Sequence, residues 1–480
     1  DPAKLYEIVT AGLGGKAFRG PAGAPRVPSE QIAPIFPLPS NLKLWRKIEE
    51  ALRAPQNHHV QLVGDMGDGK NLLMLVTARL RNQGARLVSS HGRMTQRDLL
   101  ERERAVRHED GSSSTEEVPS EFVEGAQAGE LVIFDEVHKM RPRVRGTLNR
   151  PLQKGEVVLP SGEVGPFNEE SRLAFLTNHH GGIYKGHPPT PEFLDRVVTI
   201  KVDYLPADEE LALLRWFAPD VDQDLLKRLI LVANKIRENY RSATPIMPWP
   251  VSTRALIRLA RHLQTFPADQ QRIPYVFQKI YWIPEDLPEA RRLLHNLLTG
   301  ATIGKFSDVA PTDPLVLEPV TRTVGDQQRR VLRSARRAAD GRLWDIVEHP
   351  MFDGQADGHV PGVTLQEDEK GPTNLERIHD LMKDLVLGEH IMLIGDMGTG
   401  KDWIEDVLAT LLGQPIVTVM GHEGTRPSDF TQREVARRSL EEAAGLTAWR
   451  RRAEALNEVD CCLDLARARL NGIDEDELSG

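Results

Sequence analysis

The sequence predicts an α/β core built on a parallel sheet, followed by a helical lid, a connector and a second, incomplete α/β module. Short apolar runs alternate with helical patterns up to about residue 202, and only helical patterns follow them. The glycine-rich stretch GDMGDGKN at 64–71 returns as GDMGTGKD at 395–402. Each copy lies between a short apolar run and a helical pattern, so we interpret the repeat as a whole module.

Length and charge restrict the class of protein. A chain of 480 residues exceeds a single hydrophobic core, and about three domains are expected. The net charge of -9 argues against broad binding to nucleic acid. No apolar run approaches the roughly 18 residues that a membrane helix needs, so no membrane span is expected. Because the chain starts at Asp1 without a signal-peptide pattern, we expect a processed protein or a fragment.

The first elements follow from composition and periodicity. Residues 1–39 are rich in Gly and Pro, which predicts an extended lead-in. Ser40 is the expected N-cap of a helix that places Leu44, Ile48 and Leu52 on one face.

The changes of pattern define five segments. They are the lead-in at 1–39, the α/β core at 40–203, the helical lid at 204–300, the connector at 301–371 and the second module at 372–480. Within the core, the acidic, Ser-rich piece 108–121 is expected to be an exposed loop. Within the connector, residues 326–347 are expected to be helical. The second module begins with an expected helix after Thr373, and the run HIMLI then predicts a buried strand.

The first glycine-rich stretch has the form GxxxxGK of a P-loop, in which backbone amides and a helix N-terminus surround phosphate oxygens. Lys70 would neutralise the β- and γ-phosphates. The expected nucleotide-binding residues are Gly64, Asp65, Met66, Gly67, Asp68, Gly69, Lys70 and Asn71, and in the second copy Gly395, Gly398, Gly400, Lys401 and Asp402. The alternative, a glycine-rich turn with a surface lysine, is weakened because the strand and helix context occurs twice.

A pair of carboxylates follows a second apolar run. In ELVIFDEVHKM, residues 131–134 are apolar and lead directly to Asp135 and Glu136. In open parallel sheets the carboxyl ends of the strands face the ligand crevice. Asp135 would therefore hold Mg²⁺, and Glu136 would act on the attacking water as general base. The alternative is two exposed acids at a strand end.

Three more polar residues follow in the order that such a site would need. Asn178 ends the apolar strand RLAFLTN and could orient the water. Arg196, in PEFLDRVV, could reach the γ-phosphate of a neighbouring subunit, although an isolated arginine is more often a surface ion-pair partner. Arg254 opens the lid helix STRALIRLARHL and could contact the nucleotide, or could be a solvated arginine at the start of a helix.

This order of motifs resembles the AAA+ ATPases. The segment DEVHKMRPRVRGTLNRPLQKGEVVLPSGE is similar to the MoxR, dynein and midasin branch, in which a helix leads to a β-hairpin containing Gly-Glu. The resemblance implies ATP and Mg²⁺ as cofactors, a ring or other self-association, and mechanical work on a protein substrate or adaptor. It also implies the mitochondrial matrix for a eukaryotic source, and the cytoplasm otherwise.

The sequence departs from that family pattern in two places. Asn71 stands where Ser or Thr usually gives Mg²⁺ a hydroxyl, and its carbonyl oxygen can bind the metal instead, so we expect nucleotide binding with slow hydrolysis. Asp402 stands at the same place in the second copy, where its carboxylate could bind Mg²⁺ but would also face phosphate oxygens of like charge. The second module reaches DLARARLNGIDEDELSG without an apolar strand to bury and aim its acids. The leading hypothesis is an ATPase that remodels a protein partner. A nucleotide-binding scaffold with little hydrolysis is the alternative, and a nucleic-acid motor is disfavoured by the acidic charge.

Overall fold

In the computed structural model the chain consists of two compact units, Asp1–Asp308 and Val309–Gly480. The residues that the structure describes are 1–15, 17–54, 59–107, 113–160, 162–178, 186–301, 312–324, 327–352, 360–363 and 372–416. No helix among them is both long enough and apolar enough to cross a membrane.

A five-stranded parallel sheet forms the centre of the first unit, as the sequence predicts. Its spatial order is β2 (Ala85–Ser89), β5 (Leu131–Asp135), β8 (Arg172–Asn178), β1 (Val60–Gly64) and β9 (Val198–Lys201). Every neighbouring pair in this order runs parallel. The carboxyl ends of all five strands therefore lie at one edge of the sheet.

Helices cover both faces of this sheet, which explains why β5 is apolar and buried from Leu131 to Phe134. On one face, α1 (Pro2–Thr10), α2 (Pro39–Leu52) and α3 (Lys70–Leu80) share a core with Ile133. On the other, α4 (Gln96–Leu100), α5 (Glu121–Ala128) and α6 (Pro142–Gly146) share a core with Phe134. Successive residues of β5 thus point into two different cores.

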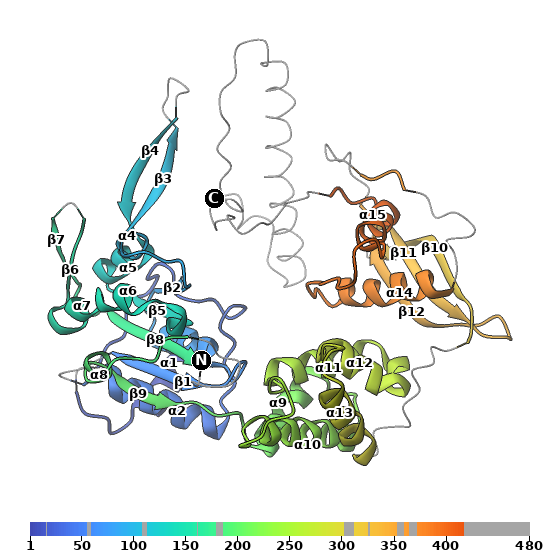
Figure 1. The fold of residues 1–480 in the computed structure, drawn as a ribbon, viewed down its shortest axis with the longest axis horizontal. Helices are drawn as coiled ribbons and strands as arrows, with labels where there is room; N and C mark the ends of the chain where they lie inside the picture. The colour runs from blue at the N-terminus through green and yellow to red at the C-terminus, as the bar shows by residue number, and fades with distance from the viewer. Residues whose placement is uncertain are drawn as a thin grey trace, which may run out of the picture. The chain divides into compact units, whose positions relative to one another are not determined.

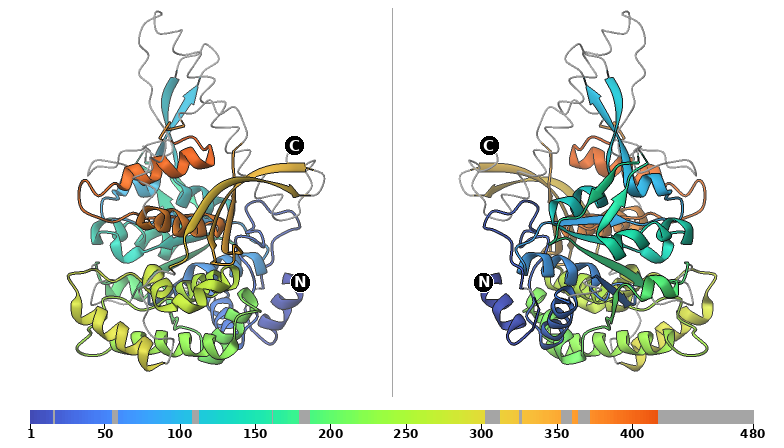
Figure 2. Two further views of the ribbon diagram at one scale, coloured as in Figure 1. Left: turned by 90° about the vertical axis from the view of Figure 1, so that its right-hand side faces the viewer. Right: turned by 90° about the vertical axis from the view of Figure 1, so that its left-hand side faces the viewer.

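Two hairpins extend from the core. The first, β3 (Glu101–Arg107) with β4 (Ser113–Pro119), projects away from the sheet in each view (Figures 1 and 2). The loop expected at 108–121 is therefore wrong from 113 onward, where β4 and the start of α5 lie, and 108–112 falls outside the described residues. The second hairpin, β6 (Glu156–Val158) with β7 (Val164–Pro166), follows η1 (Val137–Lys139), α6 and α7 (Asn149–Lys154), as expected for the Gly-Glu segment.

The lead-in begins with a helix, so the prediction of an extended chain over 1–39 is wrong for its first residues. Asp1 caps α1 by accepting a hydrogen bond from the Ala3 amide at 2.8 Å, and Pro2 opens the helix. The Tyr6 hydroxyl donates to Glu49 Oε1 at 2.8 Å, which attaches α1 to α2. The Gly and Pro residues that suggested an extended chain begin only after this helix.

Ser40 is not an N-cap, because α2 already begins at Pro39. Its hydroxyl donates instead to Glu209 Oε1 at 2.9 Å. Since Glu209 lies in the first lid helix, this contact joins the core to the lid.

The helical lid follows β9 and a short α8 (Pro191–Leu194) in the core. It contains α9 (Ala207–Phe217), α10 (Gln223–Tyr240), α11 (Thr253–Thr265), η2 (Pro267–Arg272), α12 (Ile273–Ile280) and α13 (Pro288–Gly300). These helices enclose a hydrophobic core of their own, in which Leu229, Leu259 and Phe277 are buried. The expected succession of helices without strands is confirmed for this segment.

The second unit contains an antiparallel sheet where the sequence analysis expects a helix at 326–347. The sheet has the order β10 (Leu315–Val324), β11 (Gln327–Arg337) and β12 (Leu343–Pro350). Leu332, Ser334 and Arg336 alternate along β11 and are all buried. The helical prediction failed because two of these three inward residues are polar, so the two-residue period of a strand was hidden.

Two helices accompany this sheet, α14 (Pro372–Val386) and α15 (Lys401–Leu412). Thr373 lies inside α14, one residue later than the start of the helix, and Gly388 after the helix has a left-handed φ of 68°, which is typical of a C-terminal cap. The run HIMLI, expected to be a buried strand, forms no strand among the described residues, and Met392 is 82% exposed. The segment DLARARLNGIDEDELSG lies outside the described residues.

Candidate functional site

The first glycine-rich stretch forms a loop between β1 and α3, as the sequence predicts. Gly67 and Gly69 have φ angles of 71° and 95°, which residues other than glycine rarely adopt. A β-carbon at Gly67 would collide with Ser252 of the lid, and one at Gly64 would collide with the Asp68 carboxylate. These glycines are therefore required both for the turn and for the close approach of neighbouring atoms.

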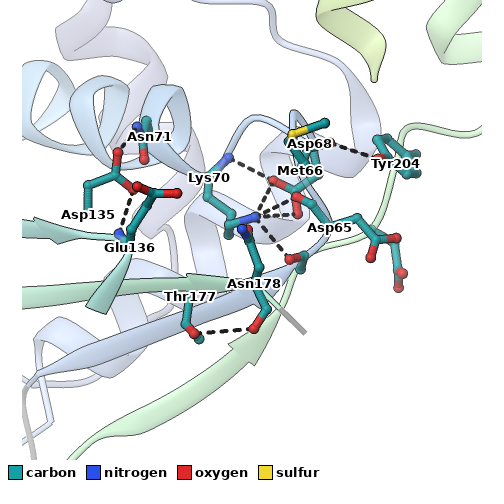
Figure 3. A network of polar contacts seen from close by, with 12 residues as sticks. Asp65, Met66, Asp68, Lys70, Asn71, Asp135, Glu136, Thr177, Asn178 and Tyr204 are labelled. Carbon is teal, nitrogen blue, oxygen red and sulfur yellow. Dashed lines mark hydrogen bonds and ion pairs between the residues drawn. The ribbon is translucent and has the colours of Figure 1, made fainter. Parts of the chain in front are cut away.

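The ends of β5 and β8 bring further polar side chains to this loop. Asp135 is the last residue of β5 and Asn178 the last of β8. The register pairs Asn178 with Gly64, the last residue of β1. Figure 3 shows Asp135, Glu136 and Asn178 at the same edge of the sheet as the loop.

One cleft of about 400 Å³ unites these residues with the lid. Its polar lining includes Lys70, Asn71, Asp135, Glu136, Asn178 and Arg254. The structure thus brings together the expected cation, carboxylates, amide and lid arginine of the first module, whereas Gly64 and Asp65, also expected to bind nucleotide, do not line the cleft. An apolar end of the same cleft is formed by Pro34, Phe36, Leu44 and Ile257. A ligand with an anionic part and a flat apolar part fits this division.

Asn71 occupies the position at which Ser or Thr usually gives Mg²⁺ a hydroxyl, and its side chain contacts Asp135. Its Nδ2 donates to Asp135 Oδ2 at 2.8 Å, so the side chain holds the carboxylate in place. Its Oδ1 remains as a hard oxygen donor beside the two oxygens of Asp135. Mg²⁺ is commonly held by one or two protein oxygens together with phosphates and water, so the donors present fit Mg²⁺ bound with a nucleotide.

Lys70 is turned back toward the base of its loop. Its Nζ donates to the carbonyl oxygens of Gly64 at 3.1 Å and Asp65 at 2.6 Å. The Asp68 carboxylate accepts from the same Nζ, with Oδ1 at 3.0 Å and Oδ2 at 3.1 Å. Burial raises the pKa of Asp68 to about 6, although the positive charge of Lys70 opposes that shift.

Glu136 has an uncommon backbone conformation and directly follows Asp135, the candidate metal ligand. Its φ is 52°, which is left-handed, and its amide donates to Asp135 Oδ1 at 2.9 Å. The side chain is about half exposed and pairs with Lys139, with 2.5 Å between Oε2 and Nζ. Glu136 must leave Lys139 to contact a water near the phosphates.

The two arginines differ in position. Arg254 lines the cleft from the first turn of α11, a helix capped by Ser252, whose Oγ accepts from the Ala255 amide at 3.0 Å. Arg196 lies after α8 and is not among the described residues that line the cleft. Its guanidinium donates to the Glu192 carbonyl. Within one chain, Arg196 therefore does not reach the site.

A set of contacts between the loop and the lid was not predicted from the sequence. Arg241, just after α10, donates to Asp65 Oδ2 from Nε at 2.8 Å and from an Nη at 2.6 Å. The Tyr204 hydroxyl donates to the Met66 carbonyl at 2.8 Å (Figure 3). Tyr204 follows the last strand of the core, a place that could have marked it as a hinge. The sequence around Arg241 gave no signal that this residue contacts the glycine-rich loop.

The second glycine-rich stretch has a local conformation similar to that of the first, but the part of the second unit that the structure describes adds no strand ending in a carboxylate beside it. Gly398 and Gly400 have φ angles of 81° and 77°, and α15 begins at Lys401. Lys401 Nζ donates to the carbonyls of Gly395 at 2.9 Å and Asp396 at 2.7 Å. Asp402 is exposed in the first turn of α15. Among the described residues of the second unit, no strand leads directly into this loop, because residues 387–394 between α14 and the loop form none, so a complete nucleotide site there stays a prediction.

Comparison with protein families agrees with this geometry. The model of the AAA domain of the dynein-related subfamily matches residues 59–197, which span β1 to the end of α8, and also residues 390–476. Both matched segments are therefore similar to AAA domains. The expected AAA+ core with its parallel sheet is thereby confirmed.

Individual relatives are distant. The chain is 23% identical over 461 residues to von Willebrand factor A domain-containing protein 8 of Mus musculus, covering 89% of the chain but 22% of the mouse protein. It is 23% identical over 223 residues to the gas vesicle ATPase GvpN of Haloferax mediterranei, covering 43% of the chain and 62% of that ATPase. The chain thus spans less than two thirds of the length of either relative.

Proposed function

We propose that the first unit of this chain is an AAA module that binds and hydrolyses ATP with Mg²⁺ and couples the nucleotide state to the remodelling of a protein partner. The observation that supports this proposal is the single cleft in which Lys70, Asp135, Glu136 and Asn178 converge. Such a set provides a cation for phosphates, a metal-ligating carboxylate and a base or orienter for water.

The chemistry assigns a task to each side chain. The loop amides and Lys70 would bind the β- and γ-phosphates, whose charge Mg²⁺ would help to neutralise when bound by Asp135 and Asn71. Glu136, once separated from Lys139, would accept the proton of the attacking water. Asn178 would hold that water in line, since its amide can both donate and accept. Positioning and charge stabilisation, rather than covalent chemistry, would supply the rate.

Contacts between the loop and the lid support the mechanical half of the proposal. Asp65 and Met66 are consecutive residues of the loop, and they bind Arg241 and Tyr204 respectively. Ser252 of the lid packs against Gly67. If the loop changes conformation when it binds phosphates, these contacts would transmit the movement to the lid. The lid movement is the step that would be transmitted to a protein substrate or adaptor.

Assembly and location are proposed from the family. AAA modules commonly work in rings, and the place of Arg196 outside its own cleft suits action on a neighbouring subunit. We place the protein in the mitochondrial matrix for a eukaryotic source and in the cytoplasm otherwise. Because the chain is acidic, with a net charge of -9, a protein partner is favoured over nucleic acid.

Phosphate release from ATP tests this function directly. With saturating ATP and Mg²⁺, the chain is expected to release phosphate steadily, and Lys70→Ala should reduce the rate to background because the phosphates lose their cation. The measurement is a coupled phosphate assay beside the solution mass with and without nucleotide. Equal rates in the two chains would remove the claim of hydrolysis at this site.

A nucleotide-dependent scaffold is the second candidate, and the Glu136–Lys139 ion pair favours it. In the present conformation that pair keeps the expected base engaged, with 2.5 Å between the two charged atoms. The scaffold predicts that ATP changes the solution mass while phosphate release stays negligible. Steady turnover by the same preparation would exclude it.

Asn71 provides a test of the metal site. Asn71→Leu removes a hydrogen bond to a charged group, which contributes roughly 1.5–3 kcal/mol, so Mg²⁺-dependent ATP affinity should fall about 10-fold or more. Titration of ATP with and without Mg²⁺ measures this difference. Asn71→Thr is the matched control, because its hydroxyl can both donate to Asp135 and bind the metal, and it should retain affinity. A similar loss in the absence of Mg²⁺ would contradict the assignment.

A further inference from the structure

The two glycine-rich loops differ in sequence at the residue before the GlyLys pair. The first has Asp68 at this place and the second has Thr399, while the preceding four residues are the same, GDMG. The chain therefore contains a natural comparison between a loop with a carboxylate and a loop with a hydroxyl.

The carboxylate changes how the loop lysine is held. Lys70 Nζ has three N–H groups, and it donates to two carbonyls and to the Asp68 carboxylate. All of its hydrogen-bonding capacity is thus used at the base of the loop. Lys401 makes only the two carbonyl contacts among the described residues, so one N–H remains for another acceptor. Thr399 takes no part, since its hydroxyl donates to the Asp396 carbonyl at 2.8 Å.

The Asp68–Lys70 pair is also shielded from water. The Asp68 side chain is 1% exposed and that of Lys70 is 8% exposed. Asp68 lies against Gly64, where any side chain would collide with it. A buried pair in this geometry interacts more strongly than one in water, so separating it has a substantial free-energy cost.

We infer that Asp68 is a positioning residue that holds Lys70 away from the phosphates and so sets the nucleotide affinity of the first loop. This inference rests on the proposed function of that loop. For Lys70 to reach β- and γ-phosphates, it must release the Asp68 carboxylate. The carboxylate must then turn outward or take up a proton, because it would otherwise lie unpaired beside like-charged phosphates.

The charges around Asp68 give the expected direction of the pH effect. Lys70 faces it and favours the carboxylate, while Asp65, itself paired with Arg241, opposes the charge. Loss of Lys70 to the phosphates would raise the pKa of Asp68 further above its value of about 6. Nucleotide binding would therefore take up a proton, and affinity should increase as the pH falls toward that value.

The test compares Asp68→Thr, which places the threonine of the second loop at the same position of the first, with the chain that keeps Asp68. Both carry Lys401→Ala, so that only the first loop reports. A charge-assisted hydrogen bond corresponds to roughly 10- to 100-fold in an equilibrium, and the variant should bind ATP with Mg²⁺ more tightly by that factor near pH 8. The difference should narrow toward about pH 6, where Asp68 is partly protonated. Isothermal titration in buffers of different ionisation enthalpy measures both affinity and proton uptake.

Asp68→Asn serves as a second variant of almost the same shape, and it should also bind more tightly and lose the proton uptake. Equal affinities and equal pH profiles in the three chains would overturn the inference while leaving the proposed function intact. Failure of all three to bind ATP at either pH would instead overturn the proposed function, and this inference with it.

Discussion

Glu136→Gln is expected to reduce ATP turnover by about 10²- to 10⁴-fold while the chain continues to bind ATP, because an amide cannot accept the proton of the attacking water. Glutamine keeps the size of the side chain and leaves the backbone around its left-handed φ of 52° unchanged. The Asp135 carboxylate, which accepts from the backbone amide of Glu136 at 2.9 Å, should also stay in place. Single-turnover phosphate release and nucleotide titration measure the two properties separately.

Glu50→Gln is the matched control for this substitution. Glu50 is an exposed carboxylate on α2 that does not line the cleft, so the same chemical change there should leave turnover unaltered. If Glu136→Gln loses ATP affinity to the same extent as turnover, Glu136 positions the nucleotide instead of acting on water. If turnover is unchanged, another group must activate the water.

The geometry of the first module was predictable because chain order and sheet topology together place motif residues. An apolar strand that ends in a carboxylate, beside one that ends in an amide, must present both at one edge when the strands are parallel. For that reason Asp135 and Asn178 were found together from sequence alone. The register between Asn178 and Gly64 confirms the placement.

The contacts to the lid were not predictable in the same way. Arg241 reaches Asp65 only because the lid helices fold against the core, and local sequence carries no signal for such a tertiary pair. Residues of the lead-in raise the same difficulty. Pro34 and Phe36 line the apolar end of the cleft, although their sequence context indicated only an irregular segment.

In the second unit, buried polar residues hide the hydrophobic periodicity that would have predicted a strand. Arg336 is fully buried on β11, where its two Nη atoms donate to the Glu376 carboxylate at 2.7 Å and 2.6 Å. Ser334 and His379 lie 2.8 Å apart, between Oγ and Nδ1. A pattern search treats such residues as solvent-facing, since buried charges are rare unless they are paired. The strand was therefore mistaken for an amphipathic helix.

Arg196→Ala is expected to reduce turnover by ~10³- to 10⁵-fold in the assembled protein while each chain still binds ATP. The physical reason is that an arginine of the neighbouring subunit would stabilise the charge that develops on the γ-phosphate. Within its own chain Arg196 donates to the Glu192 carbonyl and does not line the cleft, so a direct effect on its own site has no geometric basis. Arg215→Ala, at an exposed arginine of α9, is the control and should leave turnover unaltered.

Mixing two inactive chains distinguishes action on a neighbour from a structural defect. A subunit with Glu136→Gln keeps Arg196, and a subunit with Arg196→Ala keeps Glu136, so a mixed assembly contains complete sites at the boundary between them. Turnover should therefore recover on mixing, and its rate per chain should increase with concentration as subunits associate. No recovery on mixing, together with turnover of the unsubstituted chain that is independent of concentration, would show that Arg196 does not complete a neighbouring site and that each cleft works with the residues of its own chain.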